Sequence, residues 1–317
     1  MALIKLDHAY CHEFDSVLTI YQVRDLHFDD DASFDARNAK FECPDEDCNA
    51  PLVGVNHASV KFKNTPHFRL LIDHKHSGAC DYGNESNMKA SDESKRKGTE
   101  RNYKASYYPE VLLLERQPPP FGTGKPKKKR KAANPQTTVD ASLSNSNSDN
   151  FSPHKTRCLE HVVEIWVSND AEVLQDLPLT IGDKNKNYQN AFKNINFFTD
   201  EEGLIYWGRV KSIKDYGKNY AITFKERPWF EGENRQISIY IRNELIESYR
   251  KRKMFRSWID SLLKDGVSGV KCFFVGTYPT LKEVPVKTST GSFCPLEVHL
   301  KNLDHLVLRF KEDGEDL

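Results

Sequence analysis

Four residues of types that commonly bind metal ions lie in two close pairs in the first third of the chain. Cys43 and Cys48 are the first and last residues of Cys-Pro-Asp-Glu-Asp-Cys. His76 and Cys80 are the first and last residues of His-Ser-Gly-Ala-Cys. A structural zinc site needs four such ligands, which two short loops can supply two at a time. The four residues between the cysteines are within the usual range for chelating loops. The sequence therefore predicts a Zn²⁺ site made by Cys43, Cys48, His76 and Cys80.

The identity of the histidine ligand is open at this level. His57, His67 and His74 lie near the second pair, and His67 or His74 could replace His76. We choose His76 because its three-residue gap to Cys80 lets both side chains reach one ion from a tight Ser-Gly turn. Four unrelated polar and buried residues are the plain alternative. Disulfides are disfavoured because the chain has seven cysteines, an odd number, and begins without a secretory signal.

The residues around these ligands resemble a known module. The resemblance lies in the run from Cys43-Pro44 to Cys48, in Pro66-His67-Phe68-Arg69, and in His76 to Cys80 followed by Asp81-Tyr82. This pattern is similar to the cysteine/histidine module of competence-protein nuclease-like sequences and of related proteins of bacterial mobile elements. It covers Phe41 to Tyr82 and implies a bacterial source and a zinc-binding recognition element ahead of a nuclease domain. No nuclease signature follows Tyr82, so the resemblance does not extend to catalysis.

The amino-acid composition is that of a polar chain that can fold. The 317 residues suit two domains, and 38% hydrophobic residues with 11% aromatics can build small cores. Because 46 basic residues balance 46 acidic ones, any affinity for nucleic acid must come from local patches. No segment approaches the roughly 20 apolar residues that span a bilayer. We therefore expect a soluble cytoplasmic protein with no membrane contact.

One segment, 117–156, has the composition of a flexible linker. It contains a Pro/Gly-rich start, a basic run from Lys125 to Lys131 and a Ser/Asn/Asp-rich tract, without a periodic apolar face. It separates a zinc-binding module, 1–116, from a C-terminal domain, 157–311. Six positive charges in the seven residues of the basic run would bind phosphate through counterion release, or would form a solvated spacer.

Both folded parts are predicted to combine helices and strands, which gives an α+β class. In the first part, Leu18–Val23 fits a strand or short helix, and Ser59–Lys63 alternates as a half-buried strand does. A unit this small needs a bound metal ion to stabilise it. The second part opens with apolar residues at three- and four-residue steps over Leu159–Val167, which predicts a helix or else a buried strand. A further helical piece is expected at Tyr188–Ile195.

The elements that follow resemble the OB-fold superfamily. We expect strands at 204–213, 220–225 and 236–242, a helix at 243–264, and strands at 270–276 and 295–300. Three strands, one helix and two strands is the order of a five-stranded Greek-key barrel. The resemblance covers 204–310 and has no invariant motif. Another small β-barrel with an inserted helix is the alternative.

Alternation along the strands predicts which side chains leave the barrel core. With Ile237, Ile239 and Ile241 inside, Tyr240 and Arg242 face outward. The same rule for all three strands gives an outer face of two aromatic rings and four cations: Trp207, Arg209, Lys211, Lys225, Tyr240 and Arg242. Rings that stack on bases and cations that follow phosphates suit single-stranded nucleic acid. The alternative is that Trp207 packs beneath the segment 157–167.

The chain has no recognisable enzyme pattern. It lacks a Gly-rich phosphate loop and a nucleophile elbow, and Cys272 fits a buried inert thiol, so we name no catalytic residue and disfavour an enzyme. We expect a DNA- or RNA-binding protein whose OB-like barrel holds a single strand and whose zinc module contacts duplex or a protein partner. A protein–protein adaptor of a mobile-element or phage-defence system is the second hypothesis, and an unrecognised nuclease is the third.

Overall fold

The computed structural model describes residues 6–62, 64–78, 80, 82–83, 108–115, 155–283, 286–288 and 291–310. The chain divides into two units. Unit 1 comprises 1–58, 66–109 and 115–156, and unit 2 comprises 59–65, 110–114 and 157–317. Two short segments of the expected zinc-binding module, 59–65 and 110–114, are thus part of unit 2. The expected linker and its basic run lie outside the described residues, except for strand β7 (Lys155–Thr156).

Unit 1 is built on one antiparallel sheet of five strands in the order β2-β1-β3-β4-β5. The strands are β1 (His8–Cys11), β2 (Ser16–Thr19), β3 (Phe41–Glu42), β4 (Pro51–Val55) and β5 (His67–Leu70). The backbone N–H of Leu6 donates to the Phe68 carbonyl at 2.9 Å, so the residue ahead of β1 joins the sheet at β5. Phe41 and Phe68, with ring centroids 5.0 Å apart, are in the core.

The single helix described in unit 1, α1 (Ile20–His27), follows β2 directly and begins with a capping box. The Gln22 N–H donates to the Thr19 hydroxyl at 3.2 Å, and the Thr19 N–H donates to the Gln22 side-chain oxygen at 2.8 Å. The pair satisfies two backbone donors and fixes where the helix starts. The segment Leu18–Val23 is therefore the end of a strand and the start of a helix. The strand expected at Ser59–Lys63 is wrong, because 59–62 form no strand and contain a bend at Val60 and Lys61.

Unit 2 contains most of the secondary structure. Its helical elements are α4 (Leu159–Ser168), α5 (Ala171–Asp176), α6 (Tyr188–Ala191), η3 (Ile195–Phe197), α7 (Asn243–Glu247), α8 (Arg252–Asp265) and η4 (Leu303–His305). Its first strands are β6 (Val111–Leu112), β8 (Pro178–Ile181), β9 (Lys184–Asn187) and β10 (Phe192–Asn194). β6 pairs in parallel with β8, and β8 pairs antiparallel with β9. The helix expected at Leu159–Val167 is confirmed as α4, whereas that expected at Tyr188–Ile195 is shorter.

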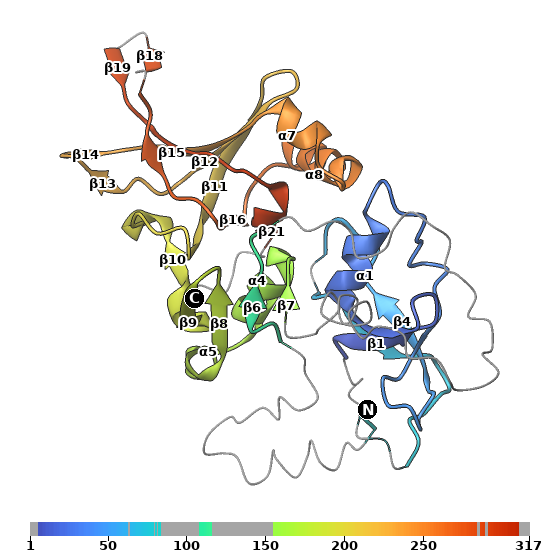
Figure 1. Ribbon diagram of the computed structural model, residues 1–317. Helices are drawn as coiled ribbons and strands as arrows, with labels where there is room; N and C mark the ends of the chain where they lie inside the picture. Colours follow the sequence, from blue (N-terminus) through green and yellow to red (C-terminus); the bar gives the residue numbers. More distant parts are fainter. Residues whose placement is uncertain are drawn as a thin grey trace, which may run out of the picture. The chain divides into compact units, whose positions relative to one another are not determined.

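The remaining strands of unit 2 build its main sheet and two hairpins. They are β11 (Ile205–Asp215), β12 (Tyr220–Phe224), β13 (Trp229–Phe230), β14 (Glu233–Asn234), β15 (Ile237–Ile241), β16 (Val270–Phe274), β17 (Thr280–Leu281), β18 (Val286–Thr288), β19 (Gly291–Phe293), β20 (Leu296–Val298) and β21 (Leu306–Phe310). The main sheet has the order β17-β20-β15-β12-β11-β16-β21, and β10 pairs in parallel with β11. In Figure 1, α7 and α8 lie side by side next to β11.

The described strands do not form the closed five-stranded barrel that the sequence predicts. Pairing runs from β17 to β21 without returning, and the sheet has more strands than expected. The strand expected at 295–300 is the shorter β20, and β21, which follows η4, was not predicted. The structure is nevertheless a mixed α and β fold with few helices and many strands. No helix in the described part of the chain has the length and apolar character to cross a membrane.

The inner face of the main sheet packs into one apolar core. Alternate residues of β15, Ile237, Ile239 and Ile241, are fully buried there, as the period of two predicts. α8 adds Phe255 and Ile259 to the same core. The single helix expected at 243–264 is two helices, α7 and α8.

Candidate functional site

The structure brings the four predicted metal ligands together. The ligand atoms of Cys43, Cys48, His76 and Cys80 all lie within 4.8 Å of one another. The Sγ atoms of Cys43 and Cys80 are 3.6 Å apart, and Nδ1 of His76 is 3.4 Å from Sγ of Cys48 and of Cys80. Tetrahedral zinc, with bonds of about 2.3 Å to sulfur and 2.0 Å to nitrogen, keeps its ligand atoms roughly 3.5 to 3.8 Å apart. The cluster therefore has a geometry that could hold one metal ion.

The sulfur atoms are not joined by disulfides. A disulfide bond is about 2.05 Å long, much shorter than the 3.6 Å between Cys43 and Cys80. Each cysteine in the described residues is free. The three thiols are thus available as metal ligands.

The first two ligands lie on the turn that joins β3 to β4. The Cys43 N–H donates to the Ala50 carbonyl at 2.8 Å, and the Cys48 N–H donates to the Asp45 carbonyl at 3.0 Å. Asn49 has φ of 48°, a left-handed conformation that asparagine tolerates better than most residues. This turn leads the chain back from Cys48 into β4 and presents both sulfur atoms on one side.

The second pair lies on the loop after β5. The Cys80 N–H donates to the Ser77 carbonyl at 3.1 Å, and the Ser77 N–H donates to Sγ of Cys48 at 3.3 Å. Gly83 closes this loop over His76, because a Cβ atom at Gly83 would lie 2.4 Å from Cβ of His76. A larger residue at this position would push the imidazole away from the sulfur atoms.

Burial controls protonation in the cluster. It raises the pKa of the Cys80 thiol to about 11 and that of Cys43 well above its usual value. Burial also raises the pKa of Cys48, but hydrogen bonds from the Ser77 and Ala50 N–H groups outweigh it and leave that pKa lowered. Burial lowers the pKa of His76, which favours the neutral imidazole that binds metals. Buried thiolates need a compensating positive charge, and a divalent cation supplies one.

The other candidate histidines are elsewhere. Nδ1 of His57 is 2.7 Å from the Gly54 carbonyl, His67 is on β5, and the His74 side chain is exposed. In the described residues, the group of possible metal ligands contains only His76 among the histidines.

A buried contact connects the second ligand loop to β1. Nε2 of the fully buried His8 is 3.2 Å from the Tyr82 hydroxyl, and Nδ1 of His8 is 2.8 Å from the Asp7 carboxylate. Because Tyr82 is two residues from Cys80, this contact helps to hold the loop in place. Nothing in the sequence distinguishes His8 from an ordinary core histidine.

The six residues predicted to bind nucleic acid are in unit 2, with unequal exposure. The exposed members are Arg209, Lys211, Lys225, Tyr240 and Arg242. Trp207 is half-buried: its ring centroid lies 5.7 Å from that of Trp166 on α4, and Nζ of Lys271 lies 5.1 Å from it. Trp207 also pairs with the fully buried Phe273 on β16. At this end of β11, helix α4 covers the outer face of the sheet.

The outer face is partly open along β15, where Tyr240 is exposed, whereas the outward residues of β12, Ala221 and Thr223, are buried. Lys214, Ala221 and Tyr240 are aligned across three strands, and so are Ser212, Thr223 and Ser238. Tyr216, in the turn between β11 and β12, is 55% exposed, and its ring centroid is 6.1 Å from that of Tyr240, which is 37% exposed. Tyr216 was not among the predicted residues, although an aromatic residue in a polar turn is a visible signal.

Between the covered and open parts of this face lies an ion pair. Glu226 has a side chain only 1% exposed, and it pairs with Arg209, whose side chain is 62% exposed. Oε1 accepts from Nε of Arg209 at 2.9 Å, and Oε2 accepts from the Arg209 backbone N–H at 2.9 Å. The burial of Glu226 was not predicted, because Lys-Glu-Arg-Pro has no periodicity that indicates a buried carboxylate.

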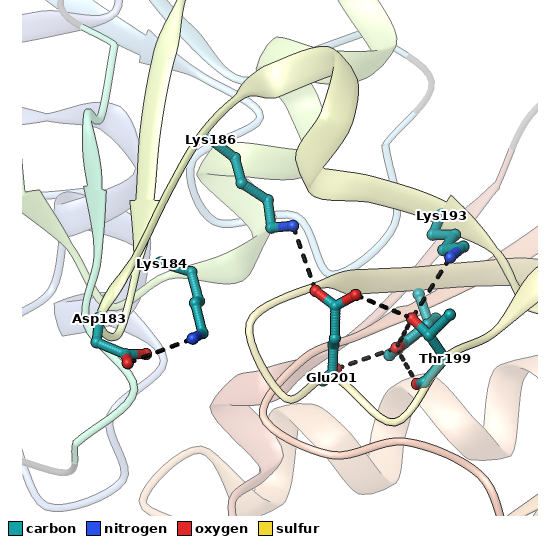
Figure 2. Close-up of polar contacts among 7 residues, drawn as sticks. Asp183, Lys184, Lys186, Lys193, Thr199 and Glu201 are labelled. Atoms are coloured by element: carbon teal, nitrogen blue, oxygen red, sulfur yellow. Dashed lines mark hydrogen bonds and ion pairs between the residues drawn. The ribbon is translucent and has the colours of Figure 1, made fainter.

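Lysines around β9 are neutralised locally (Figure 2). Lys186 is 3.3 Å from the Glu201 carboxylate, and Lys184 is 3.6 Å from that of Asp183. The Tyr206 hydroxyl donates to the carbonyls of Thr199 and Glu201, which fixes the loop before β11. Because acidic side chains pair with Lys184 and Lys186, we do not add these two lysines to the outer face of the main sheet.

Comparisons with known proteins give no assignment. No protein-family model matches the sequence, and no curated protein matches it.

Proposed function

We propose that this chain is a nucleic-acid-binding protein that holds single-stranded DNA or RNA on the outer face of the main sheet of unit 2. Zinc bound by Cys43, Cys48, His76 and Cys80 would stabilise unit 1. The proposal names no catalytic residue.

The pairing of the strands supports an OB-like interpretation of unit 2. β11, β12 and β15 form an antiparallel meander, α7 and α8 follow it, and β16 returns antiparallel to β11. β20 runs parallel to β15, and β21 runs antiparallel to β16. If β20 and β21 count as one interrupted strand, five strands follow the Greek-key order of an OB-fold. Such folds bind ligands on the face of the second and third strands and on the adjacent loops.

One observation carries the functional proposal: Tyr216 and Tyr240 are exposed together beside a row of cations. An exposed aromatic pair on a strand and its neighbouring turn offers flat rings on which bases can stack. Stacking of a base on such a ring contributes about 1 to 3 kcal/mol. The exposed cations of β11, which include Lys214, and Lys225 after β12 would follow the phosphates. Relative to the sequence-based prediction, we propose that stacking falls on Tyr240 and Tyr216, with Trp207 in a mainly packing role.

Zinc is the metal we propose for the cluster. Three sulfur ligands and one imidazole nitrogen at tetrahedral spacing suit Zn²⁺ better than Mg²⁺ or Ca²⁺, which take oxygen ligands. All four positions belong to the protein, which is typical of structural sites, whereas catalytic sites keep one position open. Elemental analysis of purified protein should give one zinc per chain. A value below about 0.2 per chain would contradict a structural site, which should be nearly full.

A titration tests the binding proposal. Fluorescence anisotropy with labelled oligothymidylate and oligouridylate should show binding that weakens with salt, because displaced counterions return at high salt. A single-strand slope is about −0.7 per phosphate contact, so four cations would give roughly −3. No binding at low salt would contradict the proposal.

A protein–protein adaptor is the second candidate function. Ile72 is 73% exposed and Leu71 is 41% exposed on the turn just before the second ligand loop. Exposed apolar residues beside a rigid metal loop suit a protein contact. If the metal-loaded protein binds no oligonucleotide, the adaptor becomes the better proposal.

A further inference from the structure

The ion pair between Glu226 and Arg209 has an unusual geometry for a surface arginine. Both carboxylate oxygens bond to one residue: Oε1 accepts from Nε, and Oε2 accepts from the backbone N–H, each at 2.9 Å. No other residue in the described part of the chain bonds to this guanidinium. The group is therefore held at its Nε edge, and its two Nη atoms are left at the surface.

The surrounding backbone is shaped to admit the Glu226 carboxylate. A Cβ atom at Gly208 would lie 3.0 Å from Oε2 of Glu226 and 2.7 Å from the ring of Phe224. Strand pairing shifts by one residue between Val210 and Ser212, which leaves Lys211 as the extra residue of a bulge. Bulges re-aim side chains and end regular pairing. The missing side chain and the bulge together create the space that the carboxylate occupies at the end of β12.

A purely structural ion pair does not require this arrangement. Burying a carboxylate with one exposed partner is costly, and an apolar residue of similar volume is often as stabilising. Arginine carries five N–H donors in a rigid fork that matches phosphate, and one of them is used here. Lys211 is exposed two residues further along β11, and the exposed Lys225 donates its backbone N–H to the Arg209 carbonyl at 2.8 Å. Their charges outnumber the single negative charge of Glu226, so an anion at the fork meets a net positive surface.

We propose that Glu226 is a positioning residue that holds Arg209 side-on, so that both Nη atoms form a preset fork for one phosphate of the bound strand. This inference rests on the proposed nucleic-acid binding. It assigns Glu226 a role through Arg209 only, with no direct contact to the ligand. Fixing the guanidinium in advance removes the entropy cost of ordering a long side chain on binding.

The sign of one substitution distinguishes positioning from simple electrostatics. Glu226→Gln removes a negative charge near a phosphate site, so electrostatics alone predicts tighter binding. Positioning predicts weaker binding, by about tenfold, because the amide holds Nε less strongly. Glu297→Gln, a carboxylate on β20 that pairs with Lys282, is the matched control and should leave affinity equal or tighter. Affinity is measured by anisotropy of labelled oligothymidylate on the full, zinc-loaded chain, with melting temperature recorded for each variant.

Two further variants complete the test. In an Arg209→Ala background, adding Glu226→Gln should weaken binding by less than about twofold, because the two residues act as one unit. Arg209→Lys, an exposed change that does not threaten folding, should lose nearly as much affinity as Arg209→Ala, although it keeps the charge. If folded Glu226→Gln binds as well as the parent or better, the positioning role is overturned. If Glu226→Gln does not fold, an Arg209→Lys variant with parental affinity overturns it. A parent that binds no oligonucleotide removes the proposed function itself.

Discussion

The metal cluster of unit 1 and the sheet face of unit 2 are defined in different ways. The four ligands come from two loops no more than 37 residues apart, and their atoms define the site by their own distances. The sheet face is defined by what covers it: α4 lies against Trp207, whereas nothing in the described residues lies over Tyr240 to the same degree. A metal site can therefore be recognised from its ligand residues alone, whereas a binding face also depends on which elements pack against the sheet.

The two regions also differ in what stabilises them. Around the metal ligands, the buried apolar cluster is small and consists mainly of the cysteines, Ala50 and their half-buried neighbours. Unit 2 has a large continuous core from its main sheet and from α7 and α8. We expect the ligand loops of unit 1 to depend on the metal and unit 2 to fold without it.

The largest effect is expected at the cluster. Cys80→Ser removes a ligand, so zinc binding and the folded state of the ligand loops should be lost together, since apparent zinc-binding energies of about 10 kcal/mol drive such modules to fold. Zinc content and NMR dispersion measure this. Cys294→Ser, at a half-buried cysteine of unit 2, should keep full zinc. Equal zinc in both variants would contradict the site.

The next effect concerns unit 2. Nζ of Lys251 lies 2.9 Å from the buried Asp304 carboxylate, which also accepts from the Tyr249 hydroxyl at 3.0 Å. Asp304→Asn removes the carboxylate charge that lies against the buried Lys251 ammonium and should lower the free energy of unfolding by about 3 to 5 kcal/mol in urea. A chelator should not change this value. Asp265→Asn, which breaks an exposed pair with Lys61, should have little effect.

The same pair gives a pH dependence. Burial raises the pKa of Asp304, but Lys251 and Arg250 outweigh it and hold that pKa at about 2. Since the pKa in the unfolded chain is about 3.9, the pair stabilises unit 2 fully above about pH 5, and this contribution is lost as the pH falls toward 2. Between pH 6 and pH 3 about half of the full contribution, roughly 1 kcal/mol, should be lost. Urea titrations at pH 6 and pH 3 should show it in the parent and not in Asp304→Asn.

A smaller effect is expected at Gly83. Gly83→Ala places a methyl group against Cβ of His76, which should displace the imidazole and weaken zinc binding by about 10- to 100-fold, as loss of ligand orientation does at other sites. Competition with a coloured chelator measures this affinity. Gly78→Ala is the matched control in the same loop, because its Cβ would meet nothing within 4 Å. Equal affinities in the two variants would show that the loop adapts.

The smallest effects separate the two aromatic residues of the sheet face. Tyr240→Ala should weaken oligonucleotide binding by about 1 to 3 kcal/mol and leave the salt slope and melting temperature almost unchanged. Trp207→Ala should instead lower the melting temperature, because its ring packs against Trp166. Trp229, which is 70% exposed on the β13–β14 hairpin, serves as a control for loss of any exposed ring. The reverse outcome would restore Trp207 as the stacking residue.

Local patterns predicted the parts of the molecule that local rules control. The spacing of Cys43, Cys48, His76 and Cys80 was sufficient because each loop closes on itself. Alternation predicted the buried isoleucines of β15, and three- and four-residue steps predicted α4. These features depend on neighbours within a few residues.

The remainder depends on residues far apart in sequence. Alternation placed Trp207 outward, but the covering helix belongs to a segment some forty residues earlier. The same rule placed Thr223 outward, yet its hydroxyl lies 3.1 Å from that of Ser238 and the residue is buried. The largely polar segment 299–305 separates β20 from β21, and the prediction ended the last strand at this segment without adding a strand after it. Periodicity indicates which face of a strand a side chain is on, but it does not indicate which other elements cover that face.

The presence of residues 59–65 in unit 2 has a consequence for the order of events during synthesis. Phe62 accepts a hydrogen bond at 3.0 Å from Arg309, a residue made 247 positions later, and Thr65 donates to Glu164 at 3.0 Å. The metal loops are complete once Gly83 has left the ribosome, whereas unit 2 must wait for Arg309 to bind a segment that emerged first. A chain shortened to begin at residue 157 would lack these contacts, so the two units cannot be separated by a single cut.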